Sequence, residues 1–267
     1  MHCEHVDDQL ERITAMAMSS NRQCMALACK FRNDKSAYVF FYDILQLHPL
    51  KRTGKFIHEG APTDEEDKQF ISIAFSPEAK YLAVLTNIKD GNARLYEWKK
   101  EARVIATNSW LSELNKEAKV PVNAEITRIS IDPNNKDQVC LSGKGHFRVW
   151  RNQSNILKPL PPIAGLDQAK GYTEHVWLEG NWLVGGTDHG ELCVVYDGKQ
   201  CVLVTPAFGG APDAVSCIHP FSQGIFVGSS AGHITVWERH DVASKDLSEE
   251  TLKGAIKFDR SIRTNSL

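Results

Sequence analysis

The segment Phe70-Ile71-Ser72-Ile73-Ala74-Phe75-Ser76-Pro77 opens the clearest copy of a pattern that the chain repeats five times. Two further apolar runs follow it, at residues 80–85 and 93–98, and a turn follows each run. The runs are short, rich in β-branched and aromatic residues, and bounded by Gly, Asp, Asn and Pro. This combination is typical of β-strands. Internal repeats indicate an architecture before any single residue does.

An aromatic residue closes the third run of each copy and serves as a ruler for the repeat. These residues are Tyr42, Trp98, Trp150, Tyr196 and Trp237. Their spacing falls from about 56 to about 41 residues, which approaches the roughly 40–45 residues of a four-stranded propeller blade. The longer spacings are explained by insertions in loops, which cost little closure entropy.

The sequence therefore predicts an all-β fold, a WD40-type β-propeller of about five degenerate blades. The predicted blades cover residues 13–56, 70–107, 126–160, 172–205 and 214–258, in one continuous array over residues 1–258. Residues 259–267 are predicted to form a flexible tail. Glycines between second and third runs, as in Gly143-Lys144-Gly145 and Asp188-His189-Gly190, predict hairpin turns with positive φ.

Composition limits the partners and the compartment. The net charge of −2 predicts no nucleic-acid partner, and no apolar stretch approaches the roughly 18 residues of a membrane-spanning helix. Seven cysteines and a polar N-terminus favour a reducing compartment, because a disulfide framework needs an even number. We therefore expect a cytoplasmic protein that does not enter a membrane.

Catalytic motifs are absent from the sequence. It contains neither a Gly-x-Ser-x-Gly elbow nor a P-loop, and His2-Cys3-Glu4-His5 has no second cluster to complete a zinc site. An enzyme of this architecture would place acids or histidines at equivalent ends of the first strands. Small hydroxyl residues occur there instead: Thr14, Ser72, Thr127, Thr173 and Ser216. We expect no catalytic residue, no metal and no cofactor.

Two features are candidates for binding a protein partner. Trp110 lies outside the repeat pattern in an inserted segment, and exposed tryptophan is enriched at interface hot spots. It could instead pin that segment to the core. Asp64, Glu65, Glu66 and Asp67 form an acidic run that could dock on a basic partner or simply be solvated.

The second copy resembles the WD40 repeat through Ile73-Ala74-Phe75-Ser76-Pro77, Tyr81-Leu82-Ala83 and the closing Trp98. It departs from that family at Ala79, where glycine is frequent, and at Glu97-Trp98, which replaces Trp-Asp. The resemblance implies a protein-interaction module. If the five copies do not close into a tight ring, the chain forms an open arc whose strand edges invite pairing with another chain, and we expect the open arc.

A narrower resemblance is to the cilia- and flagella-associated protein 57 family of large axonemal WD-repeat proteins. Asp137-Gln138-Val139-Cys140, Ser142-Gly143-Lys144-Gly145, His175-Val176-Trp177 and Val184-Gly185-Gly186-Thr187-Asp188 carry it. It implies the N-terminal region of a propeller or a shortened product. It also implies a non-enzymatic scaffold of the axoneme, in motile cilia or flagella, with dynein-associated proteins as partners. The alternatives are a general cytosolic adaptor in ubiquitin-ligase or trafficking complexes and, more remotely, a propeller enzyme.

Overall fold

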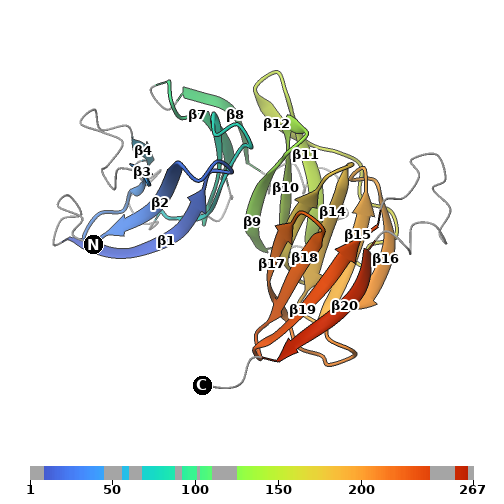
Figure 1. Ribbon diagram of the computed structural model, residues 1–267. Coiled ribbons are helices and arrows are strands. Elements are labelled where there is room, and N and C mark those ends of the chain that lie inside the picture. Colours follow the sequence, from blue (N-terminus) through green and yellow to red (C-terminus); the bar gives the residue numbers. More distant parts are fainter. Residues whose placement is uncertain are drawn as a thin grey trace. The chain divides into compact units, whose positions relative to one another are not determined.

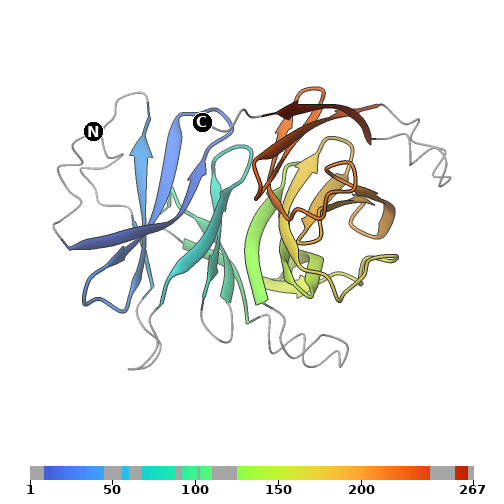
Figure 2. The same ribbon diagram turned by 90° about the horizontal axis from the view of Figure 1, so that it is seen from below.

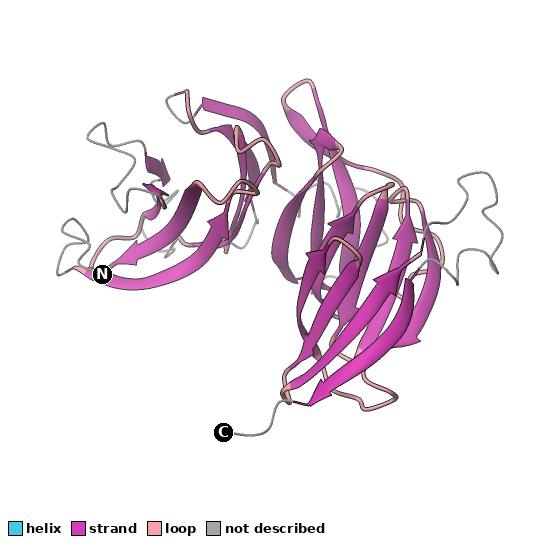
Figure 3. Cartoon of the chain, viewed as in Figure 1, coloured by secondary structure: helices cyan, strands magenta, loops and turns pink. Residues whose placement is uncertain are grey.

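The computed structural model describes residues 9–44, 56–59, 68–87, 92–100, 103–109, 125–240 and 256–263. Within these ranges every regular element is a β-strand (Figure 1, Figure 3). The strands are arranged as successive four-stranded antiparallel units, which we call the first to fifth blades. The predicted all-β class is therefore confirmed.

The first and second blades each run in simple order from one strand to the next. The first consists of β1 (Leu10–Met18), β2 (Cys24–Phe31), β3 (Ala37–Asp43) and β4 (Phe56–Glu59). The second consists of β5 (Phe70–Phe75), β6 (Tyr81–Thr86), β7 (Asn92–Glu97) and β8 (Arg103–Ser109). This order is that of an antiparallel meander, in which each strand pairs with the next one along the chain.

The third blade shares a sheet with the second. Its strands are β9 (Glu125–Asp132), β10 (Asn135–Lys144), β11 (His146–Gln153) and β12 (Ile156–Pro159). The outermost strands β8 and β12 pair in parallel at Thr107 and Ile156, which gives an eight-stranded sheet. The Thr107 amide donates to the Asn155 carbonyl at 3.3 Å beside this pair. The pairing satisfies backbone groups that an edge strand would otherwise expose.

The fourth and fifth blades return to independent sheets and lie side by side in Figures 1 and 2. The fourth consists of β13 (Tyr172–Leu178), β14 (Trp182–Thr187), β15 (Glu191–Tyr196) and β16 (Gln200–Pro206). The fifth consists of β17 (Val215–Phe221), β18 (Gly224–Ser229), β19 (His233–Arg239) and β20 (Ile256–Arg263).

The last strand differs from its predicted position. β20 continues to Arg263, so it occupies part of the segment 259–267 that the sequence predicts as a tail. Its register is set by β19, where His233 pairs with Arg263 and Arg239 pairs with Ile256. Backbone pairing with β19 holds a polar segment that has little strand character of its own.

The chain divides into two compact units. One unit comprises Met1–Lys119, Ile129–Val139 and Trp150–Pro159. The other comprises Val120–Arg128, Cys140–Val149 and Leu160–Leu267. The division runs through the third blade, so that blade contributes strand segments to both units.

Each unit has a core between neighbouring sheets. In the first unit, Ala26, Ala28 and Val39 of the first blade pack with Leu82 and Val84 of the second. In the other unit, one cluster joins the third and fourth blades and another joins the fourth and fifth. The sheets bury their apolar faces against one another, which is how a repeat architecture obtains a core.

The turn at Ala79 stores backbone strain. Ala79 has a φ of 51°, a left-handed conformation that costs a residue with a Cβ about 1 kcal/mol. We expect Ala79→Gly to raise the free energy of unfolding by about 0.5–1 kcal/mol, measured by urea denaturation. Glu78→Gly, at the preceding exposed position with ordinary φ, is the control and should be neutral or destabilising. Equal effects of the two changes would contradict the assignment of strain to Ala79.

Candidate interaction surfaces

The residues that the sequence singles out for partner binding lie outside the described residues. This applies to Trp110 and to Asp64, Glu65, Glu66 and Asp67. Their role stays a prediction. His2-Cys3-Glu4-His5 also lies outside.

The first-strand hydroxyls link neighbouring blades. Thr14 Oγ1 donates to the Phe70 carbonyl at 2.6 Å, and Thr173 Oγ1 donates to the Val215 carbonyl at 2.6 Å. In both cases the acceptor belongs to the first strand of the following blade. Ser72 makes a related contact, because its Oγ accepts from the Ile129 amide at 3.1 Å.

A β-bulge positions these hydroxyls. The register of the first and second strands shifts at Thr14, Thr173 and Ser216, each of which is the extra residue of its strand. Bulges re-aim a side chain relative to the sheet, and at Thr14 and Thr173 the bulge directs the hydroxyl to the next blade. The residues therefore serve in structural hydrogen bonds, which is a use that sequence reasoning missed although it found the residues.

A serine and a histidine that sequence reasoning did not pair lie together between the third and fourth blades. Ser142 Oγ and His175 Nδ1 are 2.7 Å apart, and both side chains are buried. Glu174 accepts from the His175 amide at 2.9 Å and forms an ion pair with Arg128, Oε2 to Nη2, at 2.6 Å. The sequence singles out Ser142 and His175 only as members of the motifs that resemble the cilia- and flagella-associated protein 57 family. No motif of fixed spacing connects the two residues.

This pair has the atoms of a nucleophile and a base but not their properties. Burial, followed by the positive charge of Arg128, lowers the pKa of His175 to about 3. A general base works best with a pKa near the operating pH. Ser142 has no exposed surface, so a substrate cannot reach it. The arrangement favours a neutral imidazole that bonds two blades.

Two buried histidines predict a loss of stability in acid. His146 resembles His175, because burial followed by the charge of Arg148 lowers its pKa to about 3. Each buried histidine contributes to the free energy of unfolding fully above pH 6.5, which is its pKa in the unfolded chain. This contribution is lost as the pH falls toward 3. The free energy of unfolding should fall by on the order of 1 kcal/mol per pH unit per histidine.

Urea denaturation of the whole chain between pH 7 and pH 5 measures this slope. In His175→Gln the part of the slope due to His175 should disappear. His189→Gln, a change at an exposed histidine, is the control and should keep the slope of the unmodified chain. A stability that does not change over this range would contradict the burial of both imidazoles in neutral form.

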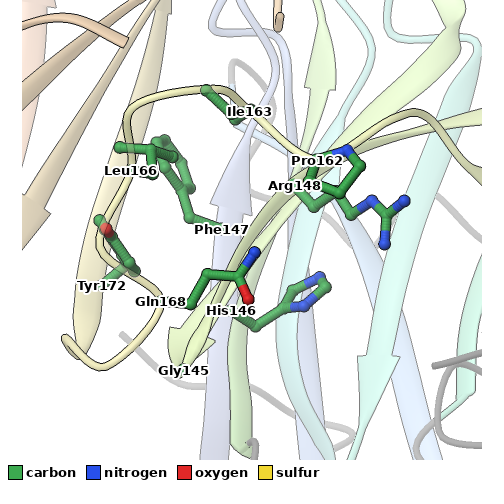
Figure 4. Close-up of a pocket in the computed structure, with 9 residues that line it drawn as sticks. All are labelled: Gly145, His146, Phe147, Arg148, Pro162, Ile163, Leu166, Gln168 and Tyr172. Carbon is green, nitrogen blue, oxygen red and sulfur yellow. The ribbon is translucent and has the colours of Figure 1, made fainter. Parts of the chain in front are cut away.

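A small pocket lies beside the third blade, between β11 and the segment that leads into β13 (Figure 4). Its lining includes His146, Phe147, Arg148 and Tyr172, and the rings of Phe147 and Tyr172 stack with centroids 5.0 Å apart. Arg148 Nε donates to the Leu160 carbonyl at 2.5 Å. The lining residues include no carboxylate and no cysteine.

Two further findings concern ligands and membranes. Among the residues that the structure describes, no group of three or more His, Cys, Asp or Glu is placed to hold a metal ion. In the same residues, no helix has the length and apolar character needed to span a membrane.

The stacked antiparallel sheets, the cores between them and the repeated inter-blade hydrogen bonds define the class of fold: it is a β-propeller. A solved structure supports the class. The β-propeller domain of Cps50 (Swd1) from Myceliophteria thermophila aligns with 96% of this chain and 73% of its own, with a TM-score of 0.66 and 13% identity. At that identity the match shows the fold alone.

A curated protein resembles the chain in sequence. Cilia- and flagella-associated protein 57 of Mus musculus is 26% identical over 193 residues, which is 72% of this chain and 14% of the mouse protein. The chain therefore spans about a seventh of the length of that relative. The resemblance to the cilia- and flagella-associated protein 57 family, stated on the sequence motifs, is confirmed. No family model matches the chain.

Proposed function

We propose that the chain is a non-enzymatic scaffold that assembles or anchors axonemal complexes in motile cilia or flagella, at the inner dynein arms. One observation carries the proposal: the similarity to a cilia- and flagella-associated protein extends over most of this chain. The proposed site of action is the cytoskeleton of the cilium, and the proposed partners are axonemal or dynein-associated proteins.

The described chemistry supports a scaffold rather than an enzyme. The serine and histidine that could have formed a catalytic pair are buried, and the imidazole has a pKa of about 3. The first-strand hydroxyls bond to carbonyls of the next blade. These polar groups are used inside the fold, which leaves loops and strand edges as the surfaces offered to partners.

Proximity labelling with the tagged chain in ciliated cells tests the function. We expect enrichment of axonemal dynein or its regulatory components over a tagged propeller of similar size and unrelated sequence. Recovery of cullin-type ligase subunits instead would favour the general adaptor. Hydrolytic turnover by the purified chain would contradict the non-enzymatic assignment.

Two variants test the candidate partner residues. Neutralising the acidic run by D64N, E65Q, E66Q and D67N should weaken labelling if a basic partner docks there. Trp110→Ala should weaken it if Trp110 is a hot spot, where truncation typically costs 2 kcal/mol or more, about 30-fold in affinity. Unchanged labelling by both variants would remove these residues from the interface.

A further inference from the structure

One end of the second and third blades carries many exposed cations. In a four-stranded meander the first and third turns lie at the same end of the sheet. The described residues of these turns and of the strand ends beside them are 76–80, 97–100, 103, 132–137 and 151–155, and all belong to one compact unit. Six cationic side chains lie there and all are exposed, a group that we call the basic cluster: Lys80, Lys99, Lys100, Arg103, Lys136 and Arg151.

The carboxylates of the same residues do not balance this charge at the surface. There are four, and two of them are buried, Glu97 at 6% and Asp132 at 5% exposure. Asp137 is partly buried, and its Oδ1 accepts from the Asn152 side-chain amide at 3.4 Å. Of the four, only Glu78 is exposed. The water-facing charge of these turns is therefore positive, although the whole chain has a net charge of −2.

Buried groups hold three of the lysines close together. Lys80 Nζ and Lys100 Nζ each lie 3.4 Å from Glu97 Oε1. Tyr81 lies directly opposite Glu97 across β6 and β7. The centroid of its ring is 5.0 Å from Lys80 Nζ and 5.6 Å from Lys136 Nζ, distances at which a ring attracts a cation. One carboxylate oxygen thus already bridges two ammonium groups, and the same group of lysines can accept a carboxylate from outside.

The other blades lack this arrangement at the equivalent position. Lys80 is the residue immediately before the second strand of its blade. In the fourth blade, Tyr196 also takes the place of Glu97 in the register. The arrangement therefore belongs to the second blade and is not a requirement of the repeated fold. In the remaining four blades the residue before the second strand is neutral: Gln23, Asn134, Asn181 and Gln223.

The chemistry of the cluster favours a carboxylate-rich peptide over a nucleic acid. Single-stranded nucleic acids are held by aromatic rings on which bases stack. The rings beside the lysines, Tyr81 and Trp98, are 7% and 4% exposed and offer no such surface. Four of the six cations are lysines, which are compact point charges, whereas the arginine fork is the group that matches phosphate.

We propose that the basic cluster binds an acidic segment of a partner protein, a peptide rich in glutamate or aspartate. Carboxylates of this segment pair with Lys80, Lys100 and Lys136, as Glu97 pairs with the first two. Complementary charge of this kind guides association and selects the partner. The inference does not depend on the ciliary assignment, because it rests on a charge pattern of this chain alone.

Fluorescence anisotropy of a fluorescein-labelled hexaglutamate peptide with the purified chain measures the binding. We expect saturable binding at low ionic strength that weakens at the physiological value of about 0.15 M, because salt screens exposed charges. A hexaglutamine peptide with the same label is the control for the peptide and should not bind.

Lys136→Gln tests the cluster without removing a partner of Glu97. It should weaken hexaglutamate binding by roughly 1.5- to 5-fold, as expected for one exposed ion pair. Lys199→Gln is the matched control and should leave binding unchanged. Lys199 occupies in the fourth blade the turn position of Lys100, since each backbone amide donates to the carbonyl three residues earlier, and its ammonium group pairs with Asp197. Both changes remove one positive charge, so a general effect of net charge would be equal in the two variants.

A triple variant tests whether the cations act together. Lys100→Gln, Arg103→Gln and Lys136→Gln in one chain should weaken hexaglutamate binding by about 10-fold or more. Lys80 remains as a partner of Glu97 in this variant. Thermal unfolding checks that each variant folds.

Three results would overturn the proposal. The first is hexaglutamate binding no stronger than that of hexaglutamine. The second is an equal effect of Lys136→Gln and Lys199→Gln. The third is tighter binding of a single-stranded oligonucleotide of the same charge as hexaglutamate, with the same loss in the triple variant, which would assign the cluster to nucleic acid instead.

Discussion

Gly143→Ala is expected to lower the free energy of unfolding by about 3 kcal/mol or more, which is a large part of the stability of an ordinary domain. A Cβ at Gly143 would lie 1.9 Å from the Glu125 carbonyl oxygen and 2.6 Å from the Ile126 Cα. Both are backbone atoms of β9, so no side chain can rotate away, and the strand itself must move. Urea denaturation followed by circular dichroism measures the loss.

Gly209→Asn is the matched control for Gly143→Ala. A Cβ at Gly209 would meet nothing within 4 Å, and asparagine tolerates the φ of 65° at that position. We expect a change below about 1 kcal/mol. If Gly143→Ala proves as mild as the control, the close approach of β9 and β10 is wrong.

Trp98→Ala is expected to cost about 3–5 kcal/mol, the range for truncating a buried tryptophan. Trp98 is buried and stacks on Phe41 of the first blade, with centroids 4.3 Å apart and an angle of 11° between the rings. Its Nε1 donates to the Ala79 carbonyl at 2.9 Å. The residue thus joins the cores of two blades and secures the turn before β6.

Trp98→Phe separates these two contributions. Phenylalanine keeps an aromatic ring against Phe41 but removes the donor to the Ala79 carbonyl. We expect a smaller cost of about 1–2 kcal/mol. A cost equal to that of Trp98→Ala would mean that the hydrogen bond, rather than the packing of the ring, dominates the contribution of Trp98.

The fourth copy shows how closely local pattern can predict structure. Its first two strands, β13 over residues 172–178 and β14 over residues 182–187, lie within the blade predicted over residues 172–205, and β13 begins at its first residue. These runs are apolar and end at Gly180, Asn181 and the Asp188-His189-Gly190 turn, where Gly190 has a φ of 76°. Strand propensity and turn chemistry agree here, and agreement between levels makes a prediction reliable.

The glycine run in the third copy shows where local pattern misleads. The sequence predicts one hairpin turn through Gly143-Lys144-Gly145. In the structure, only Gly145 has a positive φ, at 69°, and Gly143 lies within β10. Glycine is needed at position 143 because it has no side chain, and not because it can adopt a positive φ. The backbone of β9, an earlier strand, occupies the space that a side chain would need.

The candidate site residues show the same contrast between what local pattern predicts and what it does not. The sequence located the hydroxyls Thr14, Thr173 and Ser216, because they recur at one place in the repeat. It did not indicate that a bulge directs Thr14 and Thr173 to the next blade, because a bulge depends on the register between two strands. Nor did it pair Ser142 with His175, which are 33 residues apart and meet only when two blades pack.

What the residues determined by themselves is local and periodic: strands, turns and a five-fold repeat typical of a β-propeller. What only the tertiary structure decided is which side chains meet across blades and where the units divide. The reason is physical. Strand and turn preferences act between residues close along the chain, whereas burial depends on the neighbour that covers a sheet.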